Sequence, residues 1–162
     1  MGTESYSKGQ LTALVILRML IGWHFLYEGI VKVWNPGWSA AGYLLDSQGF
    51  MAKTFENMAS NPSLLNVIDI VNVWGLIFIG ISLLLGLFAK VGAIGGIVLL
   101  TFYYLSHPAL IGVEYALPSE GSYLFVNKNL IELFALVVFL YFPTSKIIGL
   151  DRLINVAFRK SG

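Results

Sequence analysis

The stretch LLNVIDIVNVWGLIFIGISLLLGLF, residues 64–88, decides the fold because it is long and predominantly apolar. The hydrocarbon core of a bilayer is about 30 Å thick, and a helix of about 20 apolar residues crosses it. These residues are therefore predicted to span a membrane as one α-helix. After only Ala89 and Lys90, another apolar run begins and covers residues 91–111. So short a link predicts a tight antiparallel hairpin of two spanning helices.

Two further apolar runs flank this hairpin, at residues 11–33 and about 123–142. Only 12% of the 162 residues are charged and 57% are hydrophobic, whereas soluble domains carry about 25% charged residues. The first run is too long for a cleavable signal peptide and carries four ionisable residues, so we expect it to be retained. The sequence predicts an all-α integral membrane protein, one domain over residues 1–162, with a bundle of four transmembrane helices.

Basic residues are distributed unequally between the two sides of this bundle. The connections at residues 34–63 and 112–122 lie on one side and contain a single lysine, Lys53. The other side carries Lys8, Lys90, Lys146, Arg152, Arg159 and Lys160. Because short cytoplasmic segments are enriched in lysine and arginine, both termini are predicted to be cytoplasmic. The protein is expected in a bacterial-type inner membrane, with the long connections outside.

Two regions outside the spans are predicted to be helical. In the first outer connection, residues 39–45 and 50–58 have helical spacing, and Asn61-Pro62 provides a cap and first-turn proline for the next span. These short helices either lie at the bilayer surface or fold over the bundle as a lid. Residues 146–160 mix apolar and basic side chains, which is typical of an amphipathic helix anchored on the cytoplasmic leaflet.

The first span carries an inward-facing polar sector. Arg18, His24, Glu28 and Lys32 fall within about 120° of the helix circumference at about 100° per residue. Ionisable groups are costly in hydrocarbon, so this sector is expected to face the bundle interior. We predict an ion pair between Arg18 and Glu132, because both lie near the bilayer midplane if the fourth span covers residues 123–142.

The other spans place their polar residues in the same outer half of the bundle. These residues are Asn66, Asp69, Asn72, His107, Asn127, Lys128, Asn129 and Glu132. A second network is expected among His24, Glu28, Asp69 and Lys128. One hypothesis is that these groups only fix helix register. The other is a ligand site, in which His24 and His107 beside carboxylates carry protons near neutral pH.

Several function classes are excluded or disfavoured. The chain has no cysteine, so it holds no iron–sulfur cluster, thiolate zinc site or other cysteine-bound cofactor. Its histidines and carboxylates come from different helices without a metal-binding spacing, so no metal site is predicted. There is no hydrolase elbow or phosphate-binding loop. A net charge of +1 provides no basic field for nucleic acid.

Several motifs resemble the DoxX family of four-helix membrane proteins. They are LR at 17–18, GWHFLYEG at 22–29 with Lys32, NKNLIEL at 127–133, FPT at 142–144 and GLDR at 149–152. The likeness extends over nearly the whole chain. The resemblance implies a subunit related to thiosulfate:quinone oxidoreductase, with quinone as acceptor and cofactor. The matching residues are Arg18, His24, Glu28, Lys128, Asn129 and Glu132.

The sequence alone is compatible with different functions. For an oxidoreductase subunit, we expect His24, Glu28 and Glu132 in catalytic roles. Ligand-binding roles are expected for Arg18, Asp69, His107, Lys128 and Asn129. Electrons would come from a periplasmic or membrane redox partner or from the substrate itself, and an oligomer is compatible with the sequence. The alternative is a non-catalytic scaffold or small-molecule-binding partner of a periplasmic protein. A transporter is disfavoured, because the predicted inner half is sealed by apolar side chains.

Overall fold

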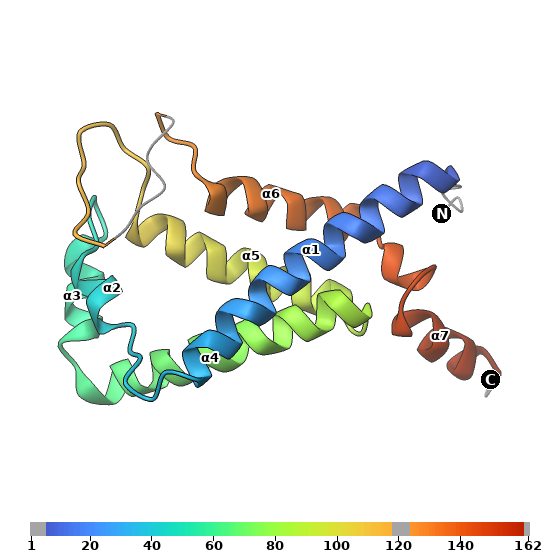
Figure 1. Ribbon diagram of the computed structural model, residues 1–162, viewed down its shortest axis with the longest axis horizontal. Helices are drawn as coiled ribbons and strands as arrows, with labels where there is room; N and C mark the ends of the chain where they lie inside the picture. The colour runs from blue at the N-terminus through green and yellow to red at the C-terminus, as the bar shows by residue number, and fades with distance from the viewer. Residues whose placement is uncertain (1–5, 118–123, 161–162) are drawn as a thin grey trace.

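The computed structural model describes residues 6–117 and 124–160, and all regular structure within them is helical, apart from a single bridge residue beside α6. Figure 1 shows the course of the chain. The elements are α1 (Lys8–Val33), α2 (Ala41–Leu45), α3 (Ala52–Ala59), α4 (Pro62–Leu85), α5 (Ala89–Ser106), α6 (Lys128–Tyr141), the 3-10 helix η1 (Thr144–Lys146) and α7 (Leu150–Lys160).

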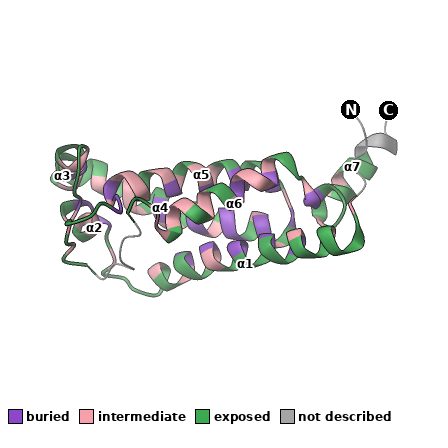
Figure 2. Cartoon of the chain, turned by 90° about the horizontal axis from the view of Figure 1, so that it is seen from above, coloured by how far each residue is buried: buried purple, intermediate pink, exposed green. Residues whose placement is uncertain are grey.

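Within the described residues, three helices are long and apolar enough to cross a membrane: α1, α4 and α5. Helix α6 has 14 residues and is therefore about 21 Å long, shorter than the hydrocarbon core. Its crossing as a fourth span stays a prediction. Figure 2 shows that much of the outer surface of the helices is exposed. Large apolar side chains lie there, for example Leu20, Phe78 and Ile131, each more than 60% exposed. Such a surface suits lipid rather than water.

The long connections lie together at one end of the bundle, which we call the loop end (Figure 1). The start of α1 and helix α7 lie at the opposite, terminal end. This confirms the predicted grouping of the connections and of the termini, although which end faces the cytoplasm stays a prediction. Helix α1 packs along α4, α5 packs against both α4 and α6, and α1 and α6 meet at few points.

The contact between α1 and α4 depends on glycines. A Cβ atom added at Gly22 would lie 2.8 Å from the backbone nitrogen of Leu84, and one at Gly80 would lie 2.5 Å from that of Leu26. Both distances are below van der Waals contact, so only hydrogen fits. The two backbones therefore approach closely at two levels of the crossing.

Close packing also occurs at Gly92 and Gly96 of α5. Gly92 lies directly against Ser82 of α4, and a Cβ atom at Gly96 would lie 2.6 Å from Leu136 of α6. Helix α5 can therefore lie close to both of its neighbours. The core centres on this contact, where Leu83, Ala93 and Leu136 are fully buried.

The hairpin between α4 and α5 forms, but its link differs from the prediction. The link is Gly86, Leu87 and Phe88, whereas Ala89 and Lys90 already belong to α5. Gly86 ends α4 with a φ of 62°, a left-handed conformation that glycine adopts without strain. The Ser82 hydroxyl donates to the carbonyl oxygen of Leu87 at 2.7 Å. These turns end the helix about three residues before the apolar run ends.

The first long connection contains both predicted short helices, with slightly later starts. The side chain of Asn61 accepts from the backbone N–H of Leu64, and Pro62 opens α4, as predicted. Phe55 of α3 is 2% exposed and packs in a small cluster with Leu44 of α2. The cluster includes side chains at the start of α4, so α2 and α3 pack on the loop end. Their placement at a bilayer surface stays a prediction.

Candidate functional site

A cavity of about 660 Å³ lies at the loop end, among α1, α4, α5, α6 and the outer connections. Its walls combine charged groups, amides and aromatic rings. The polar lining residues include His24, Glu28, Lys32, Asn72, His107, Asn127, Lys128, Asn129 and Glu132. The aromatic lining residues are Phe25, Trp38, Tyr43, Tyr103 and Tyr115. Six of the eight predicted site residues are therefore brought to one cavity, leaving out Arg18 and Asp69.

His24 and Glu132 connect α1 to α6 across this cavity. The Nδ1 atom of His24 lies 2.8 Å from Oε1 and 3.1 Å from Oε2 of Glu132. An ionised carboxylate only accepts hydrogen bonds, so Nδ1 carries the hydrogen and donates it. The Glu132 side chain is 12% exposed and that of His24 is 40% exposed. The imidazole is thus held by a sheltered carboxylate while part of its surface stays open.

A second ion pair lies nearer the loop end of α1. The Nζ atom of Lys32 donates to Oε2 of Glu28 at 3.2 Å and lies 5.2 Å from the ring centroid of Trp38. The Lys32 side chain is only 15% exposed, so it does not extend outward along the bundle. It is held over the cavity by a carboxylate and a cation–π contact.

His107 occupies the far wall, where helix α5 has just ended. Its ring stacks on Tyr43 with a centroid distance of 3.8 Å and lies 4.5 Å from the ring of Tyr115. Its Nδ1 is 3.1 Å from the Ser106 hydroxyl, and its Nε2 is 3.6 Å from Oδ2 of Asp46. The last distance is too long for a hydrogen bond. The imidazole is therefore positioned mainly by aromatic stacking.

The first turn of α6 supplies the remaining polar wall. Asn127 caps the helix by accepting from the backbone N–H of Leu130 at 3.0 Å. Lys128 and Asn129 follow it and line the cavity. Helix α6 therefore presents a capped N-terminus and a lysine to the same space as His24.

Arg18 lies outside the cavity, near the terminal end. It is 2% exposed, and its guanidinium donates to Thr144 Oγ1 at 3.0 Å and to the carbonyl oxygen of Ile148 at 2.8 Å. The predicted Arg18–Glu132 ion pair does not form. The prediction assumed a helix over residues 123–142, in which Glu132 would lie at the middle. Helix α6 begins at Lys128, so Glu132 lies in its second turn, level with His24.

Asp69 also lies outside the cavity lining. Its Oδ1 accepts from the backbone N–H of Ala40 at 2.7 Å, so it holds the connection before α2 against α4. The predicted network of Asp69 with His24, Glu28 and Lys128 is therefore wrong for Asp69.

Sequence reasoning missed several residues of the cavity wall. Tyr103 accepts from the Asn72 amide at 2.7 Å, and the Tyr43 hydroxyl donates to the Tyr103 carbonyl at 3.2 Å. The tyrosines occur in apolar helices or in a loop without a motif around them. Only Asn72 gave a signal, as an amide inside an apolar run.

Comparison with known proteins assigns the family. The DoxX family model matches residues 13–108. The chain belongs to the DoxX family. It is accordingly a membrane protein, as the three helices among its described residues that are long and apolar enough to cross a membrane also indicate. The DoxX match runs from α1 to the end of α5, so it includes His24, Glu28 and His107 but not Glu132. No curated protein and no solved structure matches the chain.

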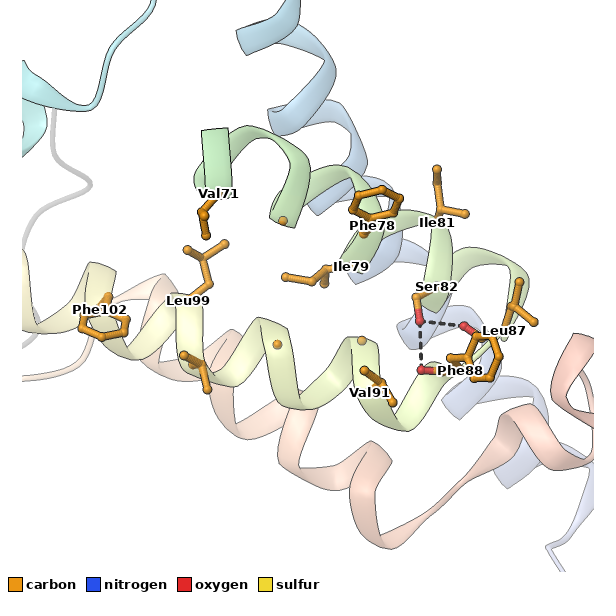
Figure 3. Close-up of a pocket in the computed structure, with 14 residues that line it drawn as sticks. Val71, Phe78, Ile79, Ile81, Ser82, Leu87, Phe88, Val91, Leu99 and Phe102 are labelled. Carbon is orange, nitrogen blue, oxygen red and sulfur yellow. Dashed lines mark hydrogen bonds between the residues drawn. The ribbon is translucent and has the colours of Figure 1, made fainter. Parts of the chain in front are cut away.

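A separate groove of about 530 Å³ runs between α4 and α5 of this DoxX protein (Figure 3). Apolar side chains line it, including Phe78, Val91 and Phe102. Its one hydroxyl, on Ser82, is bonded to the carbonyl oxygens of Leu87 and Phe88. The groove offers no free polar group for chemistry, so the polar cavity is the candidate functional site.

Proposed function

We propose that this DoxX-family protein is the membrane subunit of a quinone-linked oxidoreductase and that its loop-end cavity binds the quinone ring. The observation that carries the proposal is the His24–Glu132 pair, with its 2.8 Å contact, on the wall of a cavity inside a membrane helix bundle. Ionisable groups within membrane helices are rare and mark substrate or proton pathways, so such a pair is a functional-site hypothesis by default.

The chemistry of quinone reduction suits these groups. Each carbonyl oxygen of a quinone accepts a hydrogen bond and, on reduction to the quinol, one electron and one proton. Doubly protonated His24 can donate its Nε2 proton to a carbonyl oxygen while its Nδ1–H stays hydrogen-bonded to Glu132, and the neutral imidazole that remains takes up its next proton at Nε2. Lys128, on the same wall, supplies positive charge that stabilises the anionic intermediate. This chain has no cysteine, and the electrons come from a partner redox protein.

The rest of the cavity suits a flat ring. Phe25, Tyr43 and Tyr103 line it, and aromatic faces pack well against a conjugated ring. Buried apolar residues such as Leu76 and Leu100 also line it, and an apolar substituent of the ring is favoured beside them. Polar groups that can orient a ring, placed beside apolar and aromatic walls, are typical of small-molecule sites.

Titration of the purified protein with decylubiquinone tests this function. We expect saturable binding that is about tenfold weaker in His24→Ala and in Glu132→Gln. The first variant loses a polar contact to the quinone ring, and the second loses the carboxylate that holds His24. Glu56→Gln is the matched control, since Glu56 is exposed on α3 and does not line the cavity. Absence of binding, or equal affinity in all four proteins, would count against a quinone site.

A non-catalytic role as a membrane scaffold for a periplasmic protein is the second candidate. One observation favours it: Phe50 between α2 and α3 is 84% exposed and Trp34 after α1 is 78% exposed, and both lie in the outer connection. Exposed aromatic side chains are typical of contact surfaces. Purification from native membranes separates the candidates. A redox partner whose complex reduces quinone favours the oxidoreductase, whereas a partner without redox chemistry favours the scaffold.

A further inference from the structure

Asp46, which directly follows the short helix α2, binds the backbone of a distant segment. Its Oδ1 accepts from the backbone N–H of Ala116 and its Oδ2 from that of Leu117, both at 2.9 Å. The carboxylate thus spans two consecutive peptide groups some seventy positions along the chain. Hydrogen bonds to an ionised acceptor are about twice as strong as neutral ones.

The bound segment, residues 108–117, forms one wall of the loop-end cavity. Ala109, Leu110, Val113, Tyr115 and Leu117 all line the cavity. The segment is an irregular loop without a helix. Loops without a regular hydrogen-bond ladder depend on side chains to hold their shape. The place of this wall therefore depends on the contacts that tie the segment to the rest of the bundle.

The same carboxylate lies beside His107. Its Oδ2 is 3.6 Å from Nε2 of His107, and the imidazole is enclosed between Tyr43, three residues before Asp46, and Tyr115, just before the bound peptide groups. Tyr115 in turn donates from its hydroxyl to the carbonyl oxygen of Pro108 at 2.7 Å. The positions of His107 and Tyr115 are thus linked to that of Asp46.

We propose that Asp46 is a positioning residue for the ligand cavity, whose carboxylate binds the backbone of residues 116 and 117 and thereby fixes Tyr115 and His107 on the cavity wall. Asp46 does not itself line the cavity, so it acts through these neighbours. The identity of the ligand rests on the proposed function. The positioning of the segment does not, and the two are measured separately.

The absence of cysteine allows a direct measurement of the segment. Lys53→Cys on α3 and Glu114→Cys in the segment, both at exposed positions, receive spin labels, and pulsed dipolar spectroscopy in lipid nanodiscs gives their distance distribution. We expect a narrow distribution that broadens in Asp46→Asn, because an amide oxygen replaces only one of the two acceptors. Decylubiquinone binding should weaken about tenfold in the same variant. Glu56→Gln removes a carboxylate that does not bind residues 116 and 117, so it should change neither the distance distribution nor the affinity for decylubiquinone.

The pH dependence provides a further readout. The N–H groups of Leu117 and Ala116 hold the pKa of Asp46 below its ordinary value of 3.8. Because the pKa of Asp46 is lower in the folded protein, the stabilisation by its ionised carboxylate is complete above the ordinary pKa. It is lost as the pH falls through the lower pKa of the folded state. The titratable neighbours are His107, Tyr43 and Tyr115. The tyrosines stay neutral in this range, and a positive charge on His107 lowers the pKa of Asp46 further, so that its carboxylate stays ionised. The distribution should therefore broaden only below about pH 4.

Each outcome decides the proposal. An unchanged distribution in Asp46→Asn, or a transition near about pH 6, where histidine titrates, would overturn it. Broadening with unchanged decylubiquinone affinity would show that the segment does not shape the site and would overturn it as well. If the unsubstituted protein binds no decylubiquinone, the quinone function fails, while the distance distribution still decides whether Asp46 positions the segment.

Discussion

The guanidinium of Arg18 illustrates how a single buried charge joins distant parts of the chain. It bonds Thr144 and the carbonyl oxygen of Ile148, so it ties α1 to the segment before α7. Thr144→Val keeps the shape of the side chain but removes the acceptor. We expect the free energy of unfolding in detergent to fall by about 1–3 kcal/mol, the cost of an unsatisfied buried donor.

The conservative variant Thr144→Ser serves as the control for this prediction, because it retains a hydroxyl at the same place. Its unfolding midpoint should stay close to that of the unsubstituted protein. Equal stability of Thr144→Val and Thr144→Ser would mean that the Arg18–Thr144 hydrogen bond contributes nothing measurable.

Residue positions could be predicted from the sequence only where helix geometry fixes them. His24 and Glu28 lie one turn apart on α1, and both line the cavity, as their shared sector indicated. Which residues pair between two helices was harder to predict, because the pairing depends on where each helix begins. The late start of α6 brought Glu132 to His24 instead of Arg18. Asp46 gave no signal, since its partners are backbone groups of a distant loop.

At the scale of elements, the crossing of α1 and α4 makes the sharpest prediction. Gly80→Ala places a methyl group within 2.5 Å of the Leu26 backbone, so the helices must separate. We expect a loss of about 1–3 kcal/mol in the free energy of unfolding, as for other overpacked cores. Gly75→Ala, in the same helix, meets nothing within 4 Å and should be neutral or stabilising by up to about 1 kcal/mol. Unfolding in detergent measures both.

The opposite order of stability for the two alanine variants would contradict the close crossing. The sequence could predict that α1, α4 and α5 exist and that α4 and α5 form a hairpin, because hydropathy and link length determine both. It could not identify Gly80 as the contact point, since α4 contains glycine at both positions 75 and 80 and only the rotation of α4 against α1 distinguishes them.

At the scale of the whole molecule, the asymmetry between the two ends connects fold and proposed function. The loop end holds the polar cavity, whereas near the terminal end Arg18 is buried and Asp151 accepts from the backbone N–H of Phe88 at 2.7 Å. The ionisable groups of the loop end thus line a cavity, whereas these two groups of the terminal end bind other parts of the chain.

The same asymmetry yields a prediction about topology. Helix α6 returns the chain from the loop end to the terminal end (Figure 1), so if α1, α4 and α5 cross a bilayer, α6 with its flanking residues must cross it too. Lys53→Cys at the loop end and Lys146→Cys at the terminal end, both exposed, should then react from opposite sides. Lys53→Cys should be modified by a membrane-impermeant maleimide on intact cells, because long connections with few basic residues are exported.

Lys146→Cys should react only after the membrane is opened, since a cluster of basic residues is retained in the cytoplasm. Lys8→Cys, at the start of α1 and also exposed, is the matched control for this end and should behave in the same way. Modification of Lys146→Cys but not of Lys8→Cys on intact cells would mean that α6 does not cross. Modification of both, with Lys53→Cys protected, would mean that the bundle is inserted in the opposite orientation and that the cavity opens toward the cytoplasm.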